Sequence, residues 1–115
     1  MIISREEAVE LFNKWKTEST PLTGILVGDA AVRFSGVISE LNPYGLVLSQ
    51  TLPSGQTVEV MIGFHRVRSY DYQDSREAPP EIQKKLARKI VSVLEITFDT
   101  STVMLYEKAQ DGLAD

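Results

Sequence analysis

The chain has 115 residues, 43% hydrophobic and 24% charged, which is ordinary for one globular domain. It contains no cysteine, which excludes disulfides, thiolate zinc sites and cysteine nucleophiles. The net charge of −4 argues against a general nucleic-acid binder, because phosphate contacts favour a basic excess. No apolar run is long enough to span a bilayer, and the N-terminus lacks a signal-peptide pattern. We therefore expect a single cytoplasmic domain, residues 1–115, that does not enter a membrane.

The first predicted element is an amphipathic helix at residues 5–18. Ser4-Arg5-Glu6-Glu7 has the pattern of a capping box, in which Ser4 and Glu7 exchange hydrogen bonds. Ser19-Thr20-Pro21 is expected to end the helix. Apolar residues at helical spacing form one stripe that is predicted to enter the core: Ala8, Leu11, Phe12 and Trp15.

Five short strands are predicted next, at residues 22–28, 32–39, 46–50, 58–64 and 66–72. Turn signals separate the first four: Gly28-Asp29, Asn42-Pro43-Tyr44-Gly45 and Pro53-Ser54-Gly55. A turn or bulge between Gly63 and His65 is expected to reset the alternation and place Val67 inside. That reset keeps two arginines out of the core and puts four side chains together on the outer face: Arg66, Arg68, Tyr70 and Tyr72.

The C-terminal part is predicted to add a helix and a hairpin, residues 79–107. Pro79-Pro80 favours a helix start. Residues 91–98 and 103–107 are rich in β-branched and apolar residues, with a turn at 99–102 between them. The sequence leaves open whether this part packs on the barrel of residues 4–72, extends its sheet or builds an interface.

One helix followed by five bent strands resembles an Sm-like small barrel. The segment GVISELNPYGLVL (36–48) is similar to the second and third strands of that fold, and IGFHRVRSY (62–70) to the junction of its fourth and fifth strands. SH3-like barrels have a similar succession of short strands and tight turns. The resemblance, which covers residues 4–72, implies a domain that presents a binding surface. It places Tyr44 where RNA-binding members have a base-stacking residue, whereas the asparagine of that turn is absent.

The expected fold class is therefore α+β: an N-terminal helix, a five-strand antiparallel small barrel, then a helix and a C-terminal β-hairpin. In so small a domain the strand edges need covering, which predicts a homo-oligomer.

Most of the side-chain chemistry gathers in FHRVRSYDYQD, residues 64–74. Arginines contact phosphate and tyrosines stack on bases, so this strand is a candidate nucleic-acid face. The favoured alternative is a solvated strand whose arginines pair with nearby acids. His65 has no second histidine to form a metal or catalytic site, which favours an exposed or hydrogen-bonded histidine. The candidate binding residues are Arg66, Arg68, Tyr70, Tyr72, Tyr44 and His65.

The leading functional hypothesis is a non-enzymatic interaction or assembly module that acts as a homo-oligomer and whose protein partner is unknown; nucleic acid is possible but not favoured. The first alternative is an RNA- or ssDNA-binding barrel that uses the Arg/Tyr strand face. The second is a small-ligand-binding protein with a pocket near His65. We find no pattern for a catalytic site, a metal site or a cofactor. The basic run 84–89 is interpreted as the solvated face of the second helix.

Overall fold

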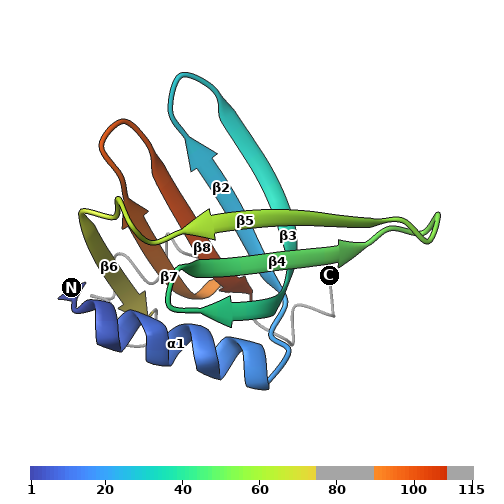
Figure 1. The fold of residues 1–115 in the computed structure, drawn as a ribbon, viewed down its shortest axis with the longest axis horizontal. Coiled ribbons are helices and arrows are strands. Elements are labelled where there is room, and N and C mark those ends of the chain that lie inside the picture. Colours follow the sequence, from blue (N-terminus) through green and yellow to red (C-terminus); the bar gives the residue numbers. More distant parts are fainter. Residues whose placement is uncertain (75–89, 109–115) are drawn as a thin grey trace.

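The computed structural model describes residues 1–74 and 90–108, which form one helix and eight strands (Figure 1). The helix, α1, covers Arg5–Thr17. The strands are β1 (Ile2–Ile3), β2 (Leu22–Val27), β3 (Ala31–Asn42), β4 (Gly45–Thr51), β5 (Thr57–Gly63), β6 (Ser69–Asp74), β7 (Ile90–Thr97) and β8 (Thr102–Lys108). The helix predicted from Pro79-Pro80, with its basic run, lies outside the described residues.

The strands form one antiparallel sheet in the order β1-β6-β7-β8-β2-β3-β4-β5. The predicted five-strand barrel followed by an appended hairpin is therefore wrong. The β7–β8 hairpin lies in the middle of the sheet, where β7 pairs with β6 and β8 pairs with β2. β1 and β5 remain at the two ends, so the sheet is open. The fold is mostly sheet, with one short helix in the described residues.

The long strand β3 connects the two halves of the sheet. Its first half pairs with β2 and its second half with β4, so β4 and β5 cross in front of the other strands (Figure 1). Gly36 lies where the halves meet, with φ +156° and the Ser49 carbonyl oxygen 2.5 Å from where a Cβ would sit. A side chain does not fit at this approach. A bulge between Ile38 and Glu40 then shifts the register, which brings Leu41 towards the core.

The helix α1 closes one end of the bent sheet. The predicted capping box is confirmed, because the Glu7 amide donates to Ser4 Oγ and the Ser4 amide donates to Glu7 Oε1, both at 3.1 Å. The predicted apolar stripe is confirmed as well, with Phe12 and Trp15 fully buried. Phe12 stacks on Phe64 with ring centroids 5.4 Å apart, and this contact joins the helix to the end of β5.

The core takes side chains from every part of the described chain. The central hairpin contributes four of its buried residues: Leu94, Ile96, Val103 and Leu105. Within residues 1–74 and 90–108, no helix has both the length and the apolar character needed to cross a membrane.

Candidate binding site at the open end of the sheet

The end of the sheet opposite α1 is open, and apolar side chains line it. We call this region the mouth and define it by Leu26, Val32, Phe34, Val60 and Phe98. These residues come from β2, β3, β5 and the β7–β8 turn, so the bend of the sheet brings them together. In Figure 1 the β2–β3 and β7–β8 hairpins rise beyond β5 on this side of the molecule.

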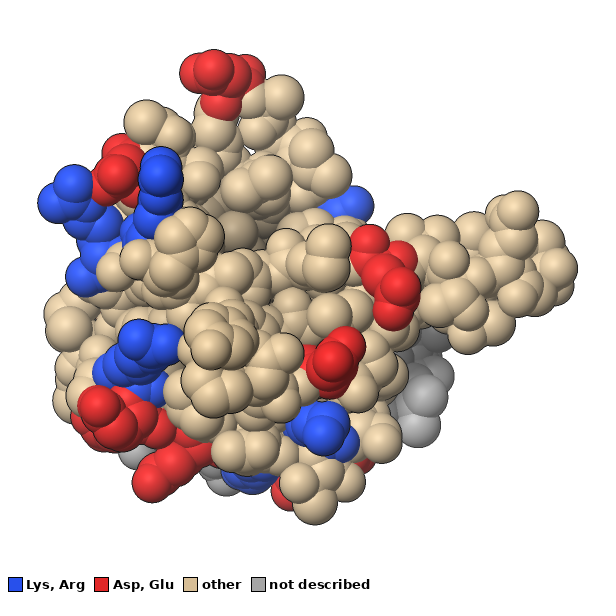
Figure 2. Space-filling model, viewed as in Figure 1, with Lys and Arg blue, Asp and Glu red and all other residues tan. Residues whose placement is uncertain are grey.

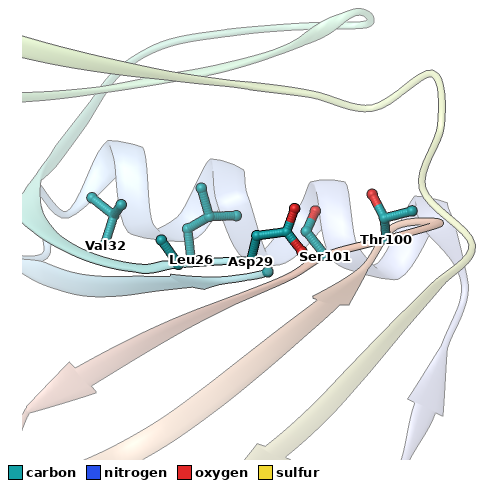
Figure 3. A pocket seen from close by; sticks show the side chains of 7 residues that line it. Leu26, Asp29, Val32, Thr100 and Ser101 are labelled. Carbon is teal, nitrogen blue, oxygen red and sulfur yellow. The ribbon is translucent and has the colours of Figure 1, made fainter.

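A first hollow of about 300 Å³ lies between the tips of these two hairpins. Figure 3 shows that Leu26 and Val32 share it with Asp29, Thr100 and Ser101. The hollow is thus apolar at its base and carries hydroxyls and one carboxylate at the turns.

A second hollow of about 220 Å³ runs between β5 and the strands that face it. Phe34 and Phe98 line it, together with the β5 residues Val60 to Gly63. The Phe34 ring lies over Gly24, where any Cβ would collide with it. Gly24 therefore lets the Phe34 ring approach the β2 backbone closely. Leu26 and Ser101 border both hollows, which makes them one continuous apolar surface.

The mouth leaves large apolar side chains in contact with water. Val32 keeps 51% of its surface exposed, and the other four residues of the mouth are half-buried. Clustered exposed apolar residues mark interaction sites more often than scattered ones do. Pockets for small molecules usually enclose roughly 300–1,000 Å³. These two open hollows are at or below the small end of that range, so their size suits the side chains of a partner.

The predicted Arg/Tyr face is not formed as expected. The turn after Gly63 is confirmed, since the Val67 amide donates to the Phe64 carbonyl at 3.3 Å, and Val67 packs against the core. Arg66 and Arg68 are exposed, as predicted. Tyr70, however, is 5% exposed and packs edge-on against Phe12.

A second irregularity explains this difference. β6 begins only at Ser69, so Val67 and Tyr70 both face inward although they are three residues apart. Tyr72 follows Tyr70 on the inner side of β6 and packs against the core. The prediction that both tyrosines share the exposed side of the arginines is therefore wrong.

Arg68 has a structural partner. Its guanidinium forms an ion pair with Asp99, and its amide donates to the Thr97 carbonyl at 2.7 Å, so the β5–β6 loop is tied to the β7–β8 turn. Figure 2 shows basic and acidic side chains next to each other in this region. Arg66 has no ion pair among the described residues.

Tyr44 and His65 are exposed near each other, at the β3–β4 turn and the β5–β6 loop. Tyr44 is 83% exposed, and its carbonyl accepts a hydrogen bond from the Phe64 amide at 2.9 Å. The His65 ring lies beside Gly63, 3.4 Å from where a Cβ would be. Neither hollow of the mouth includes His65.

One titratable group of the core is perturbed. Burial raises the pKa of Tyr70, and the charge of Arg5 opposes this shift. The Tyr70 hydroxyl is buried and has no hydrogen-bond partner among the described residues. Those residues also contain no cluster of three metal-ligating side chains.

The mouth itself was not among the sequence predictions. Leu26, Phe34 and Phe98 are ordinary apolar strand residues, and only the pairing of β2 with β8 brings them together. In comparisons with known proteins, no protein family, curated protein or solved structure matches this chain. The resemblance to Sm-like proteins stays a prediction.

Proposed function

We propose that this protein is a non-enzymatic interaction module that receives apolar side chains of a protein partner in its mouth. The observation that carries the proposal is the continuous apolar surface between the two hairpins and β5. This surface combines exposed Val32 with two aromatic rings, Phe34 and Phe98, beside hollows of side-chain size.

The β2–β3 hairpin offers a matched pair of variants to test this. Val32 lines the mouth, and Val27, which is 42% exposed, points to the opposite side of the same hairpin because neighbours of Leu26 alternate with it. Val32→Asp and Val27→Asp introduce the same charge at a similar exposure. Their effect on folding is therefore comparable, and only the first alters the mouth.

The experiment is a selection from a random peptide library displayed on phage, followed by affinity measurements on the enriched peptides. We expect peptides with apolar side chains to be enriched, with at least roughly tenfold weaker binding to Val32→Asp because a carboxylate would enter an apolar contact. Val27→Asp is expected to bind like the original protein. A selection that enriches nothing, or peptides that bind both variants equally, would refute the proposal.

Self-association belongs to the same hypothesis and stays a prediction. Light scattering behind a sizing column measures it directly, and absorbance at 260 nm across the peak tests the nucleic-acid alternative at the same time.

A further inference from the structure

The edge of β5 is the feature of the mouth that the proposed function leaves unused. β5 ends the sheet order, and no described strand pairs with its far side. The opposite end of the sheet differs, because β1 has only two residues and the Met1 ammonium group there binds Asp71 at 2.7 Å. β5 has seven residues, so it is the longer of the two free edges.

The hydrogen bonds around β5 show which of its backbone groups point away from β4. Before the strand, the Leu52 amide donates to the Gln56 carbonyl at 2.8 Å; after it, the Phe64 amide donates to the Tyr44 carbonyl at 2.9 Å. In an antiparallel pair, residues alternately bond to the neighbour and turn away from it. Gln56 and Phe64 bond to β4, so the even-numbered residues between them do too. The residues whose N–H and C=O face the free edge are Thr57, Glu59, Met61 and Gly63.

This edge lacks the features that usually block strand addition. Natural edge strands are protected by proline, lysine, bulges or short length. β5 contains no proline and no lysine, and its register with β4 is continuous from Thr57 to Gly63. Its single charge is Glu59. The β4–β5 turn and the strand residues beside it, residues 50–58, carry no charge either, and they form the uncharged projection in Figure 2.

The second hollow lies along this edge. It is bordered by Met61 and Gly63 on the β5 side and by Phe34 and Phe98 on the other. Side chains of a strand alternate between its two faces. A segment added to β5 would therefore turn every second side chain inward, towards these rings. Recognition of an extended peptide by strand addition requires free backbone N–H and C=O groups along an edge and an apolar groove for alternate side chains. The free edge of β5 and the second hollow provide both.

Charge indicates the composition of the segment. The Gly63 end of the edge leads directly to His65 and Arg66, and Arg66 has no ion pair among the described residues. An antiparallel segment would begin at this end. An acidic residue near its N-terminus would then lie close to Arg66, and apolar residues at alternate positions would follow into the mouth.

A second copy of this chain fits the edge poorly. Two β5 strands paired antiparallel about a twofold axis would place the β2–β3 and β7–β8 hairpins of both copies on the same face of the joined sheet. The β2–β3 and β7–β8 hairpins extend past β5 (Figure 1), so the hairpins of the two copies would meet in the same space. A single extended segment has no such obstacle.

We propose that the free edge of β5 binds an extended segment of a protein partner as an additional antiparallel strand, with acidic residues first and alternating apolar residues after them. This inference rests on the proposed function and names the kind of partner and its binding mode. The probe is an acetylated, amidated peptide of about seven residues, the length of β5. It has two aspartates followed by alternating valine and threonine.

Amide hydrogen exchange measured by NMR gives a site-specific readout. In the free protein, the amides of Thr57, Glu59, Met61 and Gly63 are expected to exchange fast, while those of Val58, Val60 and Ile62 are protected. Millimolar peptide is expected to slow the first set. Failure of the peptide to slow it would refute the proposal. Protection of these amides in the free protein would also refute it, and a dependence on protein concentration would identify a second copy as the occupant.

A proline substitution tests the backbone hydrogen bond at the free edge of β5 and leaves the hydrogen bonds between β5 and β4 in place. Met61→Pro removes an N–H that faces the free edge, a position at which edge strands tolerate proline. We expect it to weaken peptide binding by roughly tenfold or more, and Met61→Ala, which keeps the N–H, by no more than about threefold. A peptide N-methylated at alternate residues removes the same bonds from the ligand side, so the test does not depend on the folding of Met61→Pro.

The two proposals fail in different ways. If enriched peptides depend on Val32 but bind Met61→Pro normally and tolerate N-methylation, the mouth is a binding site and the strand-addition mode is refuted. If no peptide binds the mouth at all, both proposals are refuted.

Discussion

Leu105→Ala is expected to destabilise the whole protein, although Leu105 lies in a C-terminal hairpin that the sequence alone suggests is an addition to the domain. Its side chain is completely buried in β8, between β7 and β2. Truncation of a fully buried leucine to alanine costs about 2–5 kcal/mol of unfolding free energy, because contacts are lost and a cavity remains. A loss of about 3 kcal/mol corresponds to a fall in Tm of roughly 10–15 °C in a domain of this size.

The assay is equilibrium denaturation followed by two signals. Trp15 is the only tryptophan and is 1% exposed on the buried side of α1, so its fluorescence reports the helix end of the core. Circular dichroism reports the sheet. If the hairpin is part of one cooperative core, both signals shift together in Leu105→Ala.

Met104→Ala is the matched control, because Met104 is the neighbour on the opposite face of β8 and is only half-buried. We expect it to cost about 1 kcal/mol or less. If Leu105→Ala costs no more than Met104→Ala, or if the Trp15 transition does not move, then the central position of the hairpin is refuted.

Three further substitutions test local features. Ser4→Ala removes the N-cap of α1 and is expected to cost about 1 kcal/mol in denaturant unfolding; no change would contradict the capping box. Gly36→Ala is expected to cost about 2 kcal/mol or more, because its Cβ would lie 2.5 Å from the Ser49 carbonyl oxygen; a neutral effect in the same assay would contradict the close approach. Burial raises the pKa of Tyr70 above 10.0, so the fold favours the neutral phenol, and stability should fall as pH rises past that value. Tyr70→Phe is expected to be neutral or stabilising at pH 7 and to flatten this alkaline decline; an equally steep decline in the variant would contradict the assignment.

The local elements could be predicted from the sequence because their causes lie within a few residues. Ser4 and Glu7 are three positions apart, and the apolar stripe of α1 has the period of a helix. The β3–β4 and β4–β5 hairpins follow from Pro, Gly and Asn at their turns. The strands of the C-terminal hairpin were predicted from their β-branched and apolar residues and from the turn at 99–102 between them.

The arrangement of these elements could not be predicted in the same way. Nothing in the composition of β2 indicates that Leu22 pairs with Glu107, and the barrel prediction failed at this point. Tyr70 was placed on the outer face because one register change was expected after Gly63, whereas the structure has a second one before Ser69. The mouth depends on the same long-range pairing, so the sequence around each of its residues does not indicate that they lie together.

The central position of β7 and β8 also has a consequence for how the protein is made. β2 is bordered by β3, which follows it closely in the chain, and by β8, which leaves the ribosome long after β2 does. Until β8 emerges, β2 exposes a bare edge and Leu22 lacks part of its cover. Contacts between such distant segments raise the contact order and slow folding. We therefore expect the nascent chain to remain incompletely folded, and open to chaperones and to aggregation, until β8 has left the ribosome.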